Sequence, residues 1–103
     1  MTYENISPSE AKSRMDANPE AVIVDVRPDE FVTGHIPGAI NVPLADIQDG
    51  NIPPCIADKN AVYLIYCRSG VRSVTAAVTL EKMGYTRLAN FGGILDWPYE
   101  IEH

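Results

Sequence analysis

The sequence predicts an α/β fold: a mostly parallel central sheet of about five strands with helices on both faces. Two observations lead to this prediction. Residues 21–26 and 61–66 are apolar, β-branched runs of the kind found in strands that are covered on both faces. Segments with helical signals alternate with such runs, and this alternation is typical of a parallel sheet with crossover helices.

The first elements of the chain have clear boundaries. Residues 3–6 are expected to form a short edge strand. The stretch Ser7-Pro8-Ser9-Glu10 has the spacing of a capping box with proline at the first helical position, which predicts a helix to about Asn18. Pro19 prevents its continuation.

The next segment holds two strands and a short helix. Residues 21–26 form the first buried strand. Pro28 is expected to open a short helix through Phe31, which Gly34 ends. Residues 39–42 predict a second short strand, closed by Pro43.

The second half repeats the alternation. Residues 45–60 are rich in turn formers and are expected to form a loop with one helical turn. Residues 61–66 give the strongest strand signal of the chain. Apolar residues at helical spacing predict a helix from Ser73 to Met83. A further strand at residues 86–89 and a short C-terminal turn or helix complete the pattern.

Composition limits the classes of function. The 103 residues fit one domain, 1–103, and eight basic against fourteen acidic residues give a net charge of −6. This charge argues against general binding to nucleic acid or anionic membrane. No apolar run approaches the ~20 residues of a membrane span, and the first residues do not have the pattern of a signal peptide. We therefore expect a cytoplasmic domain that binds neither nucleic acid nor membrane.

The segment after the strongest strand carries the candidate chemistry, because ligands bind beyond the carboxyl ends of parallel strands. Cys67 ends that strand, and a helix is expected to begin near Ser73. Free N–H groups at a helix N-terminus favour an anion, and Gly70 allows the loop to turn such groups inward. Arg68 and Arg72 add positive charge.

These surroundings lower the pKa of a cysteine, and the thiolate is the nucleophile. By residue type alone, a cysteine after an apolar strand is more often an inert small hydrophobe. The position between strand and helix and the two arginines instead favour a reactive Cys67.

Residues 67–73, Cys-Arg-Ser-Gly-Val-Arg-Ser, resemble the active-site loop of rhodanese-type sulfurtransferases. Three further stretches resemble the same family in the same order, and with the loop they cover most of the chain. They are Asp25-Val26-Arg27, residues 34–41 followed by Pro43, and Asn90-Phe91-Gly92-Gly93 followed by Trp97.

The resemblance implies a sulfurtransferase. In the family, a thiolate at the position of Cys67 takes a sulfane sulfur from a small donor such as thiosulfate, and the persulfide passes it to a thiophilic acceptor such as cyanide or a thiol, protein thiols included. The side chain carries the chemistry, so no cofactor or metal is expected. Arg68 and Arg72 would hold the anionic donor and stabilise the departing sulfite. The terminal sulfur would be cradled by loop N–H groups from Arg68, Ser69, Gly70, Val71, Arg72 and Ser73.

Other polar residues are interpreted as structural. Asp25 and Arg27 are expected to fix the wall of the crevice through an ion-pair network that includes a pair between Arg27 and Glu30. His35 stays outside the catalytic set, because an ionised thiol needs no general base. Cys55 is interpreted as a loop cysteine, with the role of a resolving thiol left open.

Near the C-terminus, Phe91 and Trp97 are expected to shape the pocket rim. Ile94 stands where family members often carry an aromatic residue after the glycine pair, and this departure bears on acceptor preference. The cysteines and histidines lack the spacing of a zinc site.

Two alternatives to sulfur transfer are considered. Cysteine phosphatases use a similar strand–loop–helix cradle, but their loop is one residue longer than the four residues between Cys67 and Arg72. The smaller ring suits a sulfur atom better than a tetrahedral phosphate. A non-catalytic rhodanese-like binding or regulatory module is the other alternative, although such modules usually lack the nucleophile.

Overall fold

Within residues 3–103, which the computed structural model describes, five parallel strands form one sheet. The strands are β1 (Tyr3–Asn5), β2 (Val22–Asp25), β3 (Ile40–Asn41), β4 (Tyr63–Cys67) and β5 (Leu88–Gly93). Their spatial order is β1-β5-β4-β2-β3, so β4 lies at the centre. The carboxyl ends of all strands therefore meet at the same edge of the sheet.

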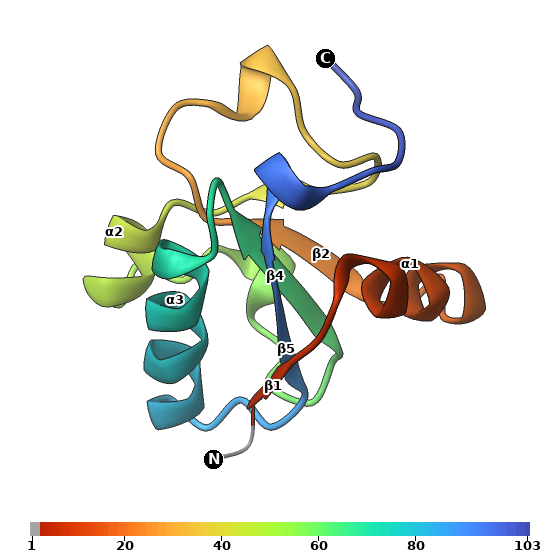
Figure 1. Cartoon of the computed structure of the whole chain (residues 1–103). Helices are drawn as coiled ribbons and strands as arrows, with labels where there is room; N and C mark the ends of the chain where they lie inside the picture. Colours follow the sequence, from red (N-terminus) through yellow and green to blue (C-terminus); the bar gives the residue numbers. More distant parts are fainter. Residues whose placement is uncertain (1–2) are drawn as a thin grey trace.

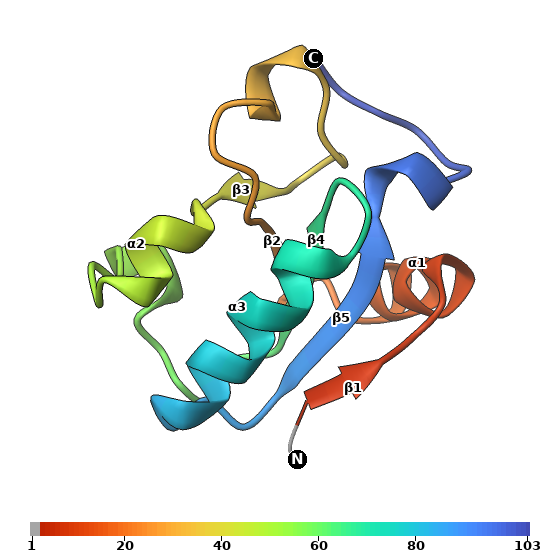
Figure 2. The same ribbon diagram turned by 60° about the vertical axis from the view of Figure 1, so that its left-hand side comes forward.

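Helices cover both faces of this sheet, as Figures 1 and 2 show. Helix α1 (Pro8–Ala17) lies on one face, and α2 (Leu44–Gln48) and α3 (Val71–Lys82) lie side by side on the other. The 3-10 turns η1 (Phe31–Thr33), η2 (Pro54–Ile56) and η3 (Ile94–Asp96) lie in the connections. The predicted α/β class, with a parallel sheet between two helical layers, is confirmed. No helix within residues 3–103 combines the length and the apolar character that crossing a bilayer requires.

The central strand contributes to both halves of the core. Tyr63, Ile65 and Cys67 belong to the apolar cluster on the side of α2 and α3. Leu64 and Tyr66 belong to the cluster on the side of α1. All five residues of β4 are buried, which explains why its sequence is a continuous apolar run rather than an alternating one.

The N-terminal helix begins where the capping-box spacing predicts. The Ser7 hydroxyl accepts a hydrogen bond from the backbone N–H of Glu10 at 3.1 Å, and Pro8 is the first helical residue. The helix ends at Ala17 with Asn18 as its C-cap, so the predicted helix is confirmed to within one residue.

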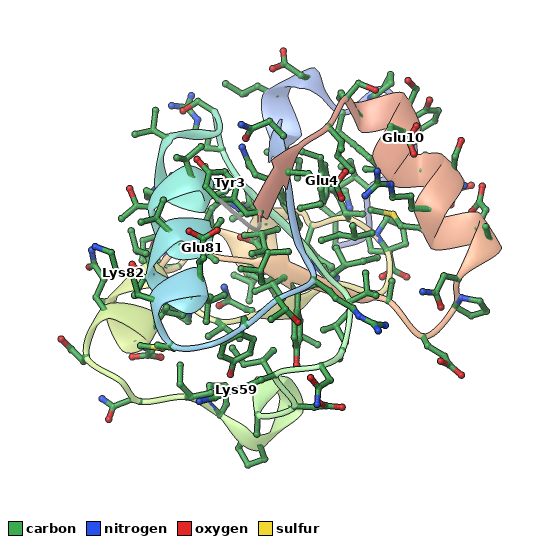
Figure 3. The ribbon with its side chains drawn as sticks, turned by 90° about the horizontal axis from the view of Figure 1, so that it is seen from below. Tyr3, Glu4, Glu10, Lys59, Glu81 and Lys82 are labelled. Atoms are coloured by element: carbon green, nitrogen blue, oxygen red, sulfur yellow. The ribbon has the colours of Figure 1, made fainter. Side chains whose placement is uncertain are left out.

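Strand β1 is held on both sides. The backbone N–H of Tyr3 donates to Oε2 of Glu81 on α3 at 3.0 Å, and Figure 3 shows β1 beside the last turns of that helix. On the other side, Glu4 pairs with Arg14 of α1 at 2.8 Å. These contacts connect the edge strand to both helical layers.

Two predicted helices begin at other residues. Helix α3 begins at Val71, not at Ser73, because Gly70 adopts the left-handed conformation with φ +101° and serves as the N-cap. The short helix expected from Pro28 begins later than predicted, as the 3-10 turn η1 at Phe31–Thr33, and Gly34 ends it as expected. The Arg27 guanidinium donates to the carbonyl of Gly34 at 2.7 Å, so the chain between them returns toward the end of β2.

The loop predicted at residues 45–60 contains more structure than one helical turn, namely α2 and η2. The last strand also differs from the predicted 86–89, since β5 runs from Leu88 to Gly93. Its pairing with β4 shifts register, from Ile65 opposite Asn90 to Cys67 opposite Gly93. Because of this shift in register, β5 continues past the predicted end at residue 89, and Gly93 lies beside Cys67 at the end of β4.

Candidate functional site

The candidate site lies at the carboxyl edge of the sheet, where β4 ends at Cys67 and α3 begins at Val71. The Cys67 loop, residues 67–73, connects β4 to α3 and lies beside the segment that leads from β5 into η3 in Figures 1 and 2. The chain reverses between strand and helix within Arg68, Ser69 and Gly70. The predicted strand–loop–helix arrangement is thus present, with the sulfur below the first turn of a twelve-residue helix.

The loop surrounds the sulfur with donors. The backbone N–H of Gly70 donates to Cys67 Sγ at 3.0 Å. Cys67 Sγ also lies 3.5 Å from the Ser73 hydroxyl oxygen on the first turn of α3. N–H groups in this first turn have no intrahelical acceptor and carry the positive end of the helix dipole. The arrangement suits a thiolate.

The pKa of Cys67 reflects two opposing effects. Burial raises the pKa of the thiol, because the charged form loses its contact with water. Hydrogen bonds from the Ser73 hydroxyl and from the backbone N–H groups of Ser73, Gly70 and Ser69 act in the opposite direction. Together these bonds prevail and hold the pKa of Cys67 below the ordinary value of a cysteine.

The Cys67 loop rests directly on the end of β5. A Cβ atom at Gly93 would stand 1.9 Å from the carbonyl oxygen of Arg68 and 2.6 Å from Cα of Ser69. Leu95, just beyond, donates its backbone N–H to the same Arg68 carbonyl at 3.2 Å. In the sequence, the Gly92-Gly93 pair is part of the family resemblance, but no local signal indicates a role for Gly93. Its role in the structure is to let two backbones meet without a side chain between them.

The two arginines of the loop differ in their surroundings. Arg68 is exposed, whereas the Arg72 side chain is about one-third exposed and pairs with Glu30 at 3.4 Å. Glu30 therefore forms its ion pair with Arg72 and not with Arg27 as predicted, although its charge still contributes to raising the pKa of Arg27. Glu30 lies within reach of the loop because η1 arches over this edge of the sheet, and an anionic ligand at Arg72 must compete with this carboxylate.

A buried ion pair forms the wall beside the loop. The Arg27 guanidinium holds the Asp25 carboxylate at 2.6 Å, and the Tyr66 hydroxyl donates to the same carboxylate at 2.9 Å. Burial raises the pKa of Tyr66, so this hydroxyl stays protonated and remains a donor. Tyr66 also accepts the backbone N–H of Ile36 at 3.1 Å. The set connects β2, β4 and the segment after η1, which agrees with the structural role expected of Asp25 and Arg27.

Access to the sulfur is closed in this conformation, since Cys67 is 0% exposed. A donor reaches Sγ only when the loop or its neighbours move. A groove of about 800 Å³ lies elsewhere, between α1 and the C-terminal segment, and contains no residue of the Cys67 loop. Trp97 thus lines a groove away from the Cys67 loop, and Phe91 is buried in the core cluster on the α1 side and forms no rim. The expectation that they shape the pocket rim therefore holds for neither residue at the Cys67 loop itself.

The remaining candidates lie away from the sulfur. His35 stacks on Phe31 with ring centroids 3.9 Å apart, and its Nδ1 lies 3.0 Å from the Phe31 carbonyl oxygen. Cys55 is exposed on η2, whose Ile56 carbonyl accepts a hydrogen bond from Tyr85 beyond the far end of α3. The twelve residues of α3 separate Cys55 from the Cys67 loop, and this separation argues against a role of Cys55 as a resolving thiol. In the part of the chain that the structure describes, no three potential ligands gather as a metal site would require.

Comparison with known proteins gives three findings. A family model described as Rhodanese-like domain matches residues 7–99. The thiosulfate sulfurtransferase PspE of Escherichia coli is 39% identical over 74 residues, which cover 71% of this chain and 70% of that protein. The crystal structure of a rhodanese-like domain protein from Staphylococcus aureus matches with a TM-score of 0.79 at 34% identity, covering 96% of each chain.

One structural neighbour has a different description. A protein of unknown function from Rhodopseudomonas palustris, called a possible tyrosine phosphatase, matches with a TM-score of 0.80 at 26% identity. The match covers 92% of this chain and 79% of that one. Proteins with this fold are thus described both as a thiosulfate sulfurtransferase and as a possible phosphatase.

Proposed function

Because the chain belongs to the rhodanese-like domain family, we propose that it transfers a sulfane sulfur from an anionic donor such as thiosulfate to a thiophilic acceptor, through a persulfide on Cys67. The observation that carries this proposal is the position of Cys67 Sγ, which accepts the Gly70 N–H at 3.0 Å at the start of α3. A thiolate is stabilised there without a metal or a separate base.

The proposed reaction has two displacements. The Cys67 thiolate attacks the outer sulfur of thiosulfate, so that an Sγ–S bond forms while the S–S bond of the donor breaks and sulfite leaves with the electron pair. The acceptor, cyanide or a thiolate, then attacks the terminal sulfur. A bond from acceptor to sulfur forms, the Sγ–S bond breaks, and the Cys67 thiolate is restored.

The loop residues receive proposed roles in these steps. Backbone N–H groups of residues 68–73 would stabilise the terminal sulfur of the persulfide, as the Gly70 N–H does for Sγ. Arg68 is exposed and can attract the donor. Arg72 can offer paired N–H donors to the sulfonate oxygens after it leaves Glu30, and it would stabilise the charge of the departing sulfite.

The test is the mass of the intact protein after treatment with thiosulfate. We expect one added sulfur atom, which cyanide removes as thiocyanate. The Cys67→Ser variant should gain no sulfur and should show no turnover, whereas Cys55→Ser, the matched control, should behave as the unaltered protein because Cys55 lies on η2. Sulfur transfer retained by Cys67→Ser would contradict the proposal.

Two other outcomes would redirect the assignment. The first rests on the structural neighbour that is called a possible phosphatase. The second rests on the complete burial of Cys67. Hydrolysis of an aryl phosphate by the same preparation, without sulfur loading, would identify a phosphatase. Neither activity, in a folded protein, would count against catalysis with these substrates and favour a binding module. The four residues between Cys67 and Arg72 favour sulfur over phosphate.

A further inference from the structure

A hydrogen-bonded chain of side chains extends from the sulfur of Cys67 into the protein. The Ser73 hydroxyl lies 3.5 Å from Sγ and donates to Oδ1 of Asn90 at 2.6 Å. Oδ1 also accepts the backbone N–H of Gly92 at 3.0 Å, and Nδ2 of Asn90 donates to Oδ1 of Asn5 at 3.1 Å. Ser73 is 0% and Asn90 7% exposed, so water does not replace these contacts.

The Ser73 hydroxyl has one proton for several acceptors. The Asn90 oxygen at 2.6 Å is the nearest of them, ahead of the carbonyls of Gly70 at 3.1 Å and Gly92 at 3.4 Å. With its proton directed at Asn90, Ser73 presents a lone pair to Cys67 and accepts the S–H of the thiol. A thiolate has no proton to give and requires the opposite arrangement, in which Ser73 donates to sulfur.

We propose that Asn90 is a positioning residue for Cys67, because it competes with the Cys67 sulfur for the single proton of the Ser73 hydroxyl. In the thiol form the hydroxyl donates to Asn90. In the thiolate form the hydroxyl turns to sulfur, and Oδ1 of Asn90 keeps only the N–H of Gly92. The exchange moves one hydroxyl proton by rotation and needs no change in the backbone.

This inference rests on the proposed function only in that Cys67 is taken as the nucleophile. It predicts that removing Asn90 shifts the ionisation midpoint of Cys67 in the direction opposite to the shift that a loosened site would cause. Without the competing oxygen, the Ser73 hydroxyl is more available to the thiolate, so removal of the Asn90 amide should make Cys67 ionise at lower pH. A variant that merely loosened the site would move the midpoint upward, toward that of an ordinary cysteine.

The experiment measures the ionisation midpoint of Cys67 from the ultraviolet absorbance of the thiolate, which requires no reagent to enter the closed site. The protein carries Cys55→Ser throughout, so that only one thiol titrates. We expect Asn90→Ala to lower the midpoint by about one pH unit, the size of one hydrogen bond to a charged group. Ser73→Ala should raise it by a similar amount.

The decisive comparison is the double variant. With Ser73→Ala in place, Asn90→Ala should produce no further shift, because the hydroxyl that transmits the effect is absent. If the shift persists in that background, or if Asn90→Ala raises the midpoint, the proposal is overturned. Asn5→Ala is the matched control, since it alters the far side of the Asn90 amide and leaves Oδ1 in contact with Ser73.

A second variant covers the case in which Asn90→Ala does not fold. Asn90→Asp retains the shape and both acceptor contacts, and its carboxylate should hold the hydroxyl more strongly and raise the midpoint. Because the new charge also repels the thiolate directly, the part of the shift that the hydroxyl transmits is the part that Ser73→Ala removes, and a shift of equal size with Ser73→Ala in place would overturn the proposal. Other ionisable groups on the elements packed around Cys67 stay the same in all variants. They are Arg68, Arg72 with Glu30, Asp25 with Arg27, Asp46, Tyr63 and Tyr66. Because no sulfur donor is used, a failure of sulfur transfer would leave this measurement intact.

Discussion

Gly93→Ala isolates the contact between the Cys67 loop and β5. Gly93 has φ −131° and ψ 156°, a conformation that alanine adopts without strain, so the only obstacle is the added methyl group. That group would stand 1.9 Å from the Arg68 carbonyl oxygen, whereas ordinary contact begins at 3.4 Å. The loop must therefore retreat by about 1.5 Å, which breaks the 3.0 Å bond from Gly70 N–H to Sγ.

The expected loss follows from this displacement. Misplacing a reacting group by about 1 Å can cost ~100-fold in rate, so we expect kcat/KM for thiosulfate to fall ~100-fold in Gly93→Ala. Overpacking should also lower the free energy of unfolding by about 1–3 kcal/mol. The assays are thiocyanate formation and thermal unfolding of the same preparation.

The control is Gly50→Ala at the end of α2. Gly50 has φ +77° with no atom within 4 Å of a Cβ placed there, so this variant introduces backbone strain without a clash. We expect a loss of stability of about 1–2 kcal/mol with kcat/KM unchanged. A Gly93→Ala protein that turned over thiosulfate within about threefold of the unaltered protein would refute the geometric argument.

Three further predictions follow from the site. Arg72→Ala should lower kcat/KM for thiosulfate by ~10- to 1000-fold. Arg72→Lys should recover only part of this loss, because an ammonium lacks the paired donors of a guanidinium, and equal losses with an uncharged sulfur donor would indicate a purely structural arginine. Tyr66→Phe should lower the free energy of unfolding in urea by about 1–3 kcal/mol, since it leaves the buried Ile36 N–H without an acceptor and removes one donor from Asp25, which keeps Arg27. An unchanged denaturation midpoint would contradict this. The thiolate absorbance of Cys67 should titrate below the ~8.5 of a free cysteine, so that sulfur loading slows as the pH falls through that midpoint; an ordinary midpoint would count against the electropositive loop.

Much of the fold could be predicted from local pattern. The buried run at residues 61–66 and the cap at Ser7 each depend on neighbouring residues in the sequence, and both were located to within about two residues. The family resemblance drawn from residues 67–73 and the three other stretches is confirmed by the match over residues 7–99. Local signals and short motifs were sufficient for these conclusions.

The contacts that complete the site could not be predicted in this way. Ser73 reaches Asn90 across 17 residues of sequence, and Arg72 reaches Glu30 across 42. Both depend on strand register and on the path of a loop, and neither follows from residue type. The start of the helix expected at Pro28 was likewise misplaced, and in the structure this segment is closed by the bond from Arg27 to the Gly34 carbonyl, which no local pattern shows.

The burial of Cys67 limits the size of what its sulfur can carry while the loop stays closed. Sγ lies between the apolar cluster beneath α3 and the backbone of the loop, so any group bound to it displaces protein atoms rather than water. A single sulfur atom is a small addition, whereas an alkyl or acyl group is several atoms larger and would act as a wedge between β4 and α3. In the proposed reaction, the closed loop would therefore favour a small transferred group over a large one. A bulky thiol reagent should lower the stability of the whole domain as it reacts.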